Sequence, residues 1–173
     1  AAARLLLLTL VRKSELTDAK WAEISFTNAL WTIPKERMKR RRDHLVPLPD
    51  QAMEIFMALK TFAGGSEYVL PSRYDADAPM SAATLNRTLE LVYKAAQADD
   101  QALEKFGPHD LRRTGSTLLH EAGYNTDWIE KQLAHEQQGV RAVYNKAEYL
   151  EQRRGMLQDW ANMIDGWVKR QPA

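Results

Sequence analysis

The chain has 173 residues, about the length of one domain, and its 45% hydrophobic and 27% charged residues are close to the average for globular proteins. These values exclude disordered, collagen-like and low-complexity chains. The sequence contains no cysteine, which excludes disulfide frameworks and thiolate metal sites. The formal net charge is only +1, because 24 Lys and Arg stand against 23 Asp and Glu, so overall charge does not indicate a nucleic-acid partner.

The N-terminal residues, AAARLLLLTLV, are typical of the interior of a buried helix. Their apolar run is far shorter than the roughly 20 residues that span a bilayer, and Arg12 and Lys13 follow it without a signal-peptide cleavage site. A soluble, cytoplasmic protein is therefore expected. No initiator methionine or capping residue precedes the run, which predicts that residues 1–173 are one domain of a longer protein.

After residue 20 the spacing of the apolar residues is no longer that of a helix. The stretch Trp21–Pro34 (WAEISFTNALWTIP) carries aromatic and β-branched residues on both sides of the polar pair Thr27–Asn28, which is typical of a β-hairpin. Residues His44–Leu48 (HLVPL) predict a third short strand, and Pro47 favours an edge position because proline cannot donate to a ladder. Together these stretches predict a small, three-stranded antiparallel sheet.

Residues 35–44 (KERMKRRRDH), called the basic segment below, would connect the second and third strands. The segment holds six Lys and Arg side chains against Glu36 and Asp43. So dense a run of like charge is either solvated or in contact with an anion. Without other evidence, a solvated turn is the more common outcome.

The remainder of the chain shows helical spacing and helix-ending signals. The predicted helices are one capped by Asp50 that ends at Gly64–Gly65, one capped by Ser81, and four over residues 110–122, 126–134, 140–144 and 150–168. An apolar stripe on the last helix packs either on its own domain or on a neighbouring protomer; its members are Leu150, Leu157, Trp160, Ile164 and Trp167. The expected fold class is α+β, mainly helical, in a single domain.

His109 and Arg112 lie three residues apart near the start of a predicted helix, so both can reach one anion at its positive end. Taken alone, the pair is explained better by a capped helix start with solvated charges. The pair becomes a candidate site only together with other residues that precede and follow it along the chain.

Four further residues are candidates for chemistry. Arg12 ends the apolar run, with Glu15 spaced to pair with a basic neighbour and hold it, and Lys39 lies in the basic segment. His135 closes an apolar helix, and Tyr144 follows nine residues later in the segment VRAVY. For these last two residues the structural alternatives are a helix-terminal cap and a packed core tyrosine.

The order of these candidates resembles that of the tyrosine recombinases, also called phage integrases, and most of all the integrases of satellite phages and genomic islands. The similarity extends from LTLVRKSEL through the basic segment to PHDLRRTGSTLLHEAG, QLAHE and VRAVYNKAEYLEQRR. It implies the catalytic, C-terminal domain of a longer integrase whose upstream DNA-binding domains are absent. One departure is visible, because Leu10 stands where the family usually has a glycine, two positions before the first arginine; it predicts a distortion of the turn that presents Arg12.

The chemistry of these side chains suits the transfer of a phosphodiester without a metal. Arg12 and Arg112 can bind the nonbridging phosphoryl oxygens, and Lys39 can protonate the leaving 5′ oxygen. Tyr144 is the expected nucleophile, with His109 as general base and later acid, and His135 as a hydrogen-bond donor to the phosphate.

The resemblance implies a 3′-phosphotyrosyl DNA intermediate and site-specific recombination. No cofactor is expected, because one ester replaces another of similar energy. Metal catalysis is also not expected, since His44 and His120 have no partner at metal-ligand spacing.

The expected partner is double-stranded DNA at attachment sites, bound through phosphates by Arg40, Arg41, Arg42 and Arg113. The resemblance further implies a homo-tetramer on DNA, a monomeric free fragment, and accessory DNA-bending proteins. Two alternatives remain open at this stage. One is a nicking and closing enzyme similar to the type IB topoisomerases, and the other is a DNA-binding module without activity.

Overall fold

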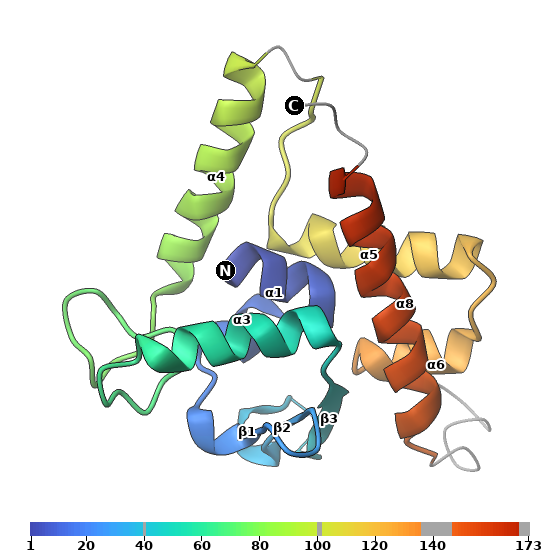
Figure 1. Ribbon diagram of the computed structural model, residues 1–173, viewed down its shortest axis with the longest axis horizontal. Coiled ribbons are helices and arrows are strands. Elements are labelled where there is room, and N and C mark those ends of the chain that lie inside the picture. The colour runs from blue at the N-terminus through green and yellow to red at the C-terminus, as the bar shows by residue number, and fades with distance from the viewer. Residues whose placement is uncertain (40, 100–101, 136–146, 170–173) are drawn as a thin grey trace.

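The computed structural model describes residues 1–39, 41–99, 102–135 and 147–169 (Figure 1). Its helices, in chain order, are α1 (Ala2–Thr9), α2 (Lys13–Thr17), α3 (Asp50–Thr61), α4 (Ala82–Ala98), α5 (Pro108–Glu121), α6 (Thr126–Gln132) and α8 (Leu150–Lys169). Within these ranges no helix is long and apolar enough to cross a membrane. The expected helix over residues 140–144 lies outside the described residues.

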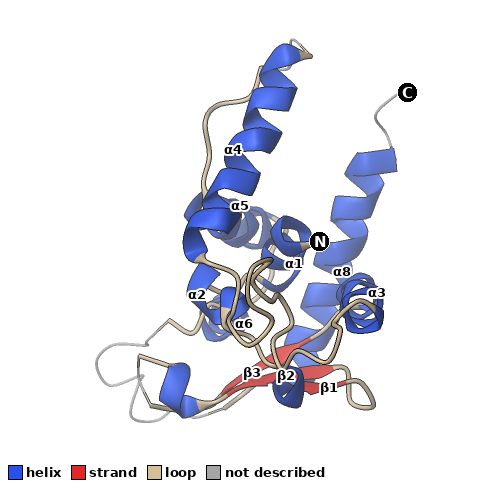
Figure 2. Ribbon diagram, turned by 90° about the vertical axis from the view of Figure 1, so that its left-hand side faces the viewer, coloured by secondary structure: helices blue, strands red, loops and turns tan. Residues whose placement is uncertain are grey.

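Helix α1 is the buried centre of the fold, as its unbroken apolar sequence predicts. Leu5, Leu6 and Leu8 are buried, and the helix contacts α3, α4, α5 and α8. It lies near the middle of the molecule in Figure 2. Because the C-terminal end of α1 is buried, as are Leu10 and Val11 after it, the residues that follow the helix are placed by packing on several sides.

The three predicted strands form one antiparallel sheet in the order β1 (Ile24–Ser25), β2 (Leu30–Ile33) and β3 (His44–Pro47). Trp31 pairs with Val46, and both face the core, where the Trp31 ring meets the edge of Phe56 from α3 at a centroid distance of 6.0 Å. The edge position that Pro47 predicts for β3 is confirmed.

The basic segment connects β2 to β3, as predicted, and extends away from the sheet (Figure 2). It opens with a short 3-10 helix, Lys35–Arg37. The backbone N–H of Lys35 donates to Asp43 Oδ1 over 2.8 Å, which closes the base of the segment.

The capping predictions hold for α4 and shift by one residue for α3. The Ser81 hydroxyl accepts from the N–H of Thr84 at the start of α4. Asp50 is the first residue of α3 rather than its cap, because Pro49 occupies the extended N-cap position.

The apolar stripes of α4 and α8 are only partly buried. Leu85 and Leu89 are buried, whereas Val92, three residues further along α4, is 48% exposed. Helix α4 extends beyond the rest of the fold (Figure 1). In α8, Trp160 is buried and its indole N–H donates to the Leu7 carbonyl over 2.7 Å. Trp167 is 44% exposed and meets Trp160 edge to face. The stripe of α8 therefore packs mainly on its own domain.

Candidate active site

Arg12 stands at the start of α2, where Glu15 holds it in place. Glu15 accepts one hydrogen bond from the Arg12 backbone N–H over 2.7 Å and one from Nη1 over 2.8 Å. Glu15 is buried, whereas the Arg12 side chain is 42% exposed. A second nitrogen, Nη2, donates to the Ala134 carbonyl over 3.4 Å. The pairing predicted from the spacing of these residues is thus confirmed, and part of the guanidinium faces outward.

Arg112, in the first half of α5, is 6% exposed and bound by two backbone carbonyls. Its Nη1 donates to Leu10 O over 2.6 Å and its Nη2 donates to Leu133 O. Burial, together with the nearby positive charge of Arg12, lowers the pKa of Arg112 to about 10. The side chain therefore stays charged at neutral pH, and its orientation is fixed.

Both arginines line one pocket of about 340 Å³. Its lining residues are Val11, Arg12, Lys13, Ser14, Pro108, His109 and Arg112. Among the described residues that line it, three carry cationic side chains and none carries a carboxylate. The pocket lies at the N-terminus of α5, where the helix dipole favours an anion. It has the charge and the donors to bind a phosphodiester.

Leu10 occupies the turn between α1 and Arg12 and adopts the left-handed conformation, with φ 55° and ψ 23°. This is the region that a glycine adopts without strain. Leu10 N–H donates to Leu6 O over 2.9 Å, and its carbonyl receives Arg112. The turn thus has the geometry that favours glycine even though it carries a leucine.

His135 is exposed and its Nδ1 lies 3.0 Å from Glu130 Oε2. It directly follows Ala134, whose carbonyl is reached by Arg12. The backbone at the end of this helical region is therefore adjacent to the arginine pocket, while the imidazole itself pairs with Glu130.

The remaining predicted residues are not all part of this cluster. Lys39 is exposed in the basic segment, and within the described residues it makes no hydrogen bond or ion pair. Arg41 and Arg42 are also exposed, and Arg113 forms an exposed ion pair with Asp110 over 3.0 Å. Arg40 and Tyr144 lie outside the described residues.

Sequence reasoning missed a buried polar cluster between β3, α6 and α8. Gln132 Oε1 accepts from Arg153 Nε and Nη2 over 3.1 and 2.7 Å, and Gln132 Nε2 donates to Thr9 O. His44 Nε2 donates to the Gln132 carbonyl over 3.1 Å. Arg153 falls four residues before buried Leu157, and this i, i+4 spacing on the apolar face was the available signal.

Burial dominates the electrostatics of this cluster. It lowers the pKa of His44 to about 3, with the charge of Arg153 acting in the same direction. Burial also lowers the pKa of Arg153 to about 10. Across residues 1–39, 41–99, 102–135 and 147–169, no three His, Asp or Glu side chains gather in a metal-binding arrangement.

The sequence and the fold can now be compared with known proteins. Residues 1–151 match the phage integrase family. Prophage integrase IntZ of Escherichia coli is 45% identical over 166 residues, which cover 95% of this chain and 39% of that relative. The chain thus spans about two fifths of the length of this relative.

Two solved structures share the fold at low sequence identity. XerA recombinase superposes with a TM-score of 0.65 at 19% identity, over 99% of this chain and 58% of that chain. A lambda integrase tetramer bound to a Holliday junction gives a TM-score of 0.58 at 21% identity, over 89% of this chain and 42% of that one. Together with the sequence match, these similarities show that the chain belongs to the phage integrase family and has the catalytic-domain fold of the tyrosine recombinases.

Proposed function

We propose that the chain is the catalytic domain of a longer site-specific DNA recombinase that cleaves and rejoins DNA through Tyr144. The observation that carries this proposal is the pocket in which Arg12 and Arg112 meet beside His109 at the positive end of α5. Membership of the integrase family and the 39% coverage of a prophage integrase support it.

The two arginines bind the nonbridging oxygens of the scissile phosphate. Arg112 uses two of its five N–H donors on backbone carbonyls, which leaves three donors in a fixed orientation. Arg12 is held less tightly and is more exposed, so it can adjust to the DNA. Fixed donors of this kind stabilise the charge that develops on the phosphoryl oxygens without reorganising during the reaction.

Proton transfer accompanies each step of the reaction. The phenol of Tyr144 has an ordinary pKa near 10, so forming a phenolate at pH 7 requires about 4 kcal/mol. His109 accepts this proton, and the cations of the pocket stabilise the phenolate. Lys39 protonates the leaving 5′ oxygen, and His135 donates to the phosphate. Attack by a 5′ hydroxyl of the partner strand reverses the step, so neither a nucleotide cofactor nor a metal is required.

The substrate is double-stranded DNA at the attachment sites of a mobile genetic element in the bacterial cytoplasm, on the nucleoid. Arg40, Arg41, Arg42 and Arg113 contact DNA phosphates, which position the duplex without reading its sequence. The lambda integrase structure is a tetramer on a Holliday junction. By analogy, four copies assemble on DNA with accessory DNA-bending proteins, while the free domain is monomeric.

A nicked suicide duplex tests the activity. The duplex carries the repeat that bounds the genomic segment containing this gene, and a nick next to the cleavage position lets the leaving fragment diffuse away. In buffer with a metal chelator, the full-length gene product is expected to accumulate a covalent protein–DNA adduct. Tyr144→Phe is expected to bind the duplex without forming the adduct. Binding by the wild type with no adduct, or an adduct that needs a metal, would contradict the proposal.

A further inference from the structure

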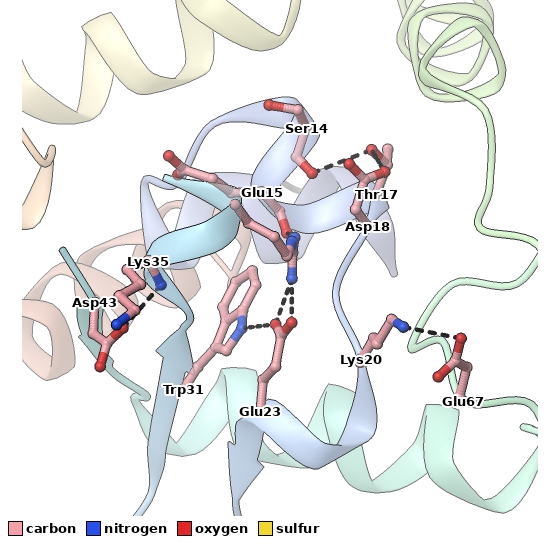
Figure 3. A network of polar contacts seen from close by, with 11 residues as sticks. Ser14, Glu15, Thr17, Asp18, Lys20, Glu23, Trp31, Lys35, Asp43 and Glu67 are labelled. Carbon is pink, nitrogen blue, oxygen red and sulfur yellow. Dashed lines mark hydrogen bonds and ion pairs between the residues drawn. The ribbon is translucent and has the colours of Figure 1, made fainter. Parts of the chain in front are cut away.

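Arg37 differs from the other described Lys and Arg residues of the basic segment because its side chain is turned into the protein. Its side chain is only 19% exposed and its Nη1 contacts both carboxylate oxygens of Glu23, which is 8% exposed. Glu23 Oε2 also accepts from the indole N–H of buried Trp31 over 2.9 Å (Figure 3). The guanidinium is thus bound to a carboxylate that the sheet itself holds in place.

Glu15 connects this ion pair to the arginine pocket. Its carbonyl accepts a hydrogen bond from Arg37 Nη2, while its carboxylate holds the backbone and side chain of Arg12. A single residue of α2 therefore contacts both Arg12 and the basic segment. A displacement of Arg37 would therefore move both the basic segment, to which its backbone belongs, and α2, which its side chain contacts through Glu15.

Lys39 is the first exposed residue after this anchored stretch. Met38 is buried in the core, so the chain is fixed by Arg37 and Met38 immediately before Lys39. On the other side, the hydrogen bond from Lys35 to Asp43 closes the base of the segment. Lys39 thus extends from a backbone whose position is fixed relative to Arg12.

We infer that Arg37, held by Glu23, is a positioning residue that places Lys39 at the leaving oxygen of the phosphate bound by Arg12. The inference rests on the proposed function, in which Lys39 is the general acid. A buried ion pair is weak evidence for a role in stability alone, because desolvation offsets much of its attraction. The Lys39 ammonium is a compact acid on a flexible four-carbon side chain, so it needs a fixed backbone to direct it to one atom. The rigid ion pair of Arg37 and Glu23 supplies that fixed point.

Changing the leaving atom of the substrate distinguishes this positioning role from a purely structural role. During cleavage the Tyr144 oxygen bonds to phosphorus, the bond from phosphorus to the 5′ oxygen breaks, and that oxygen takes the electron pair and a proton from the Lys39 ammonium. With sulfur in place of the bridging 5′ oxygen, a thiolate leaves instead. A thiol has a pKa near 8.5, so this leaving group needs no proton. The sulfur substrate therefore depends on folding and on the arginines but not on the position of Lys39.

The test compares the cleavage rates of two suicide duplexes that differ only in this bridging atom. The full-length gene product is assayed as wild type, Arg37→Ala, Glu23→Gln and Lys39→Ala. Lys35→Ala is the matched control, because it removes a positive charge from the same segment at an exposed side chain. Glu23→Gln is the milder variant, since it keeps the size of the side chain and an acceptor for Trp31.

General acid catalysis contributes roughly 10²- to 10⁴-fold, so misplacing the acid should slow cleavage of the oxygen duplex by at least about tenfold. Arg37→Ala, Glu23→Gln and Lys39→Ala are expected to show this loss, and to cleave the sulfur duplex within about threefold of the wild-type rate. Lys35→Ala is expected to match the wild type on both.

Equal losses on both duplexes in the Arg37 and Glu23 variants would show a structural role only and overturn the inference. Full activity of both variants on the oxygen duplex would also overturn it. A wild-type protein that cleaves neither duplex would instead refute the proposed function.

Discussion

Leu10 has a backbone conformation that is strained for an L-residue, and the contacts of its side chain offset this strain. The left-handed region costs a residue with a Cβ roughly 1–2 kcal/mol. The Leu10 side chain is fully buried, and a Cβ added at Gly115 of α5 would overlap its Cδ2 atom. The leucine thus fills the space that the absent Cβ of Gly115 leaves open, and its carbonyl can still receive Arg112.

This complementarity predicts coupled effects on stability. Leu10→Gly relieves the strain but leaves a cavity whose cost is about 3 kcal/mol or more, so the free energy of unfolding should fall by about 2 kcal/mol. Gly115→Ala should destabilise the wild type, because the new Cβ meets Leu10. In the Leu10→Gly background the same change should be neutral or stabilising, since alanine favours a helix over glycine. Urea unfolding of the four proteins measures this cycle, and additive effects would contradict the proposed contact.

At the scale of elements, the polar cluster of His44, Gln132 and Arg153 joins β3, α6 and α8. Gln132 bonds to Arg153 through its oxygen and to Thr9 through its nitrogen, so both ends of the amide are used. Arg153 also donates to Glu148 O, just before α8. These bonds satisfy the polar groups that packing of the three elements removes from water.

The cluster predicts a pH dependence of stability. The pKa of His44 is about 3 in the folded state and near 6.5 when unfolded, so acidification protonates the unfolded state first. The stabilising contribution is fully present above pH 6.5 and is lost progressively as the pH falls from there towards 3. Between pH 7.5 and 5.5 the free energy of unfolding should fall by about 1 kcal/mol on this account. Urea titrations should show a smaller fall in His44→Gln, and an equal fall in both proteins would contradict the assignment.

The hairpin and most helices were predictable from local sequence. The Thr27–Asn28 pair between apolar residues identified β1 and β2, Pro47 identified an edge strand, and Ser81 identified the start of α4. The buried cluster was not predictable in this way. His44 lies 88 residues before Gln132, and Arg153 lies 21 residues after it. Sequence periodicity describes only neighbours within one element, so it does not show that these residues meet.

At the scale of the whole molecule, the candidate site is assembled from distant segments around α1. Arg12 follows α1 directly, Arg112 comes from α5, and Ala134 follows α6. Residue types and order predicted that Arg12 and Arg112 share one site, and both line one pocket, but they did not predict that Arg112 is buried and bound by two carbonyls. The inward orientation of Arg37 was equally hidden, because the other described Lys and Arg residues of the basic segment are exposed and nothing in the local sequence distinguishes Arg37 from them.

The site concentrates positive charge before any DNA is bound. Burial lowers the pKa of Arg112, and the positive charge of Arg12 lowers it further, because two guanidiniums that line one pocket repel each other. An anion between them removes this repulsion and completes their hydrogen bonds. The arrangement therefore favours a bound anion.

In the proposed reaction Tyr144 attacks the phosphate bound by these arginines, and this attack can be tested by mapping the residue that becomes linked to DNA. Trypsin cleaves after Arg141 and Lys146, so Tyr144 falls in the peptide 142–146, whereas Tyr149 falls in the peptide 147–153. Tandem mass spectrometry of the digested adduct is expected to find a 3′-phosphonucleotide on Tyr144. A nucleotide attached to Tyr149, or to any other residue, would contradict the account.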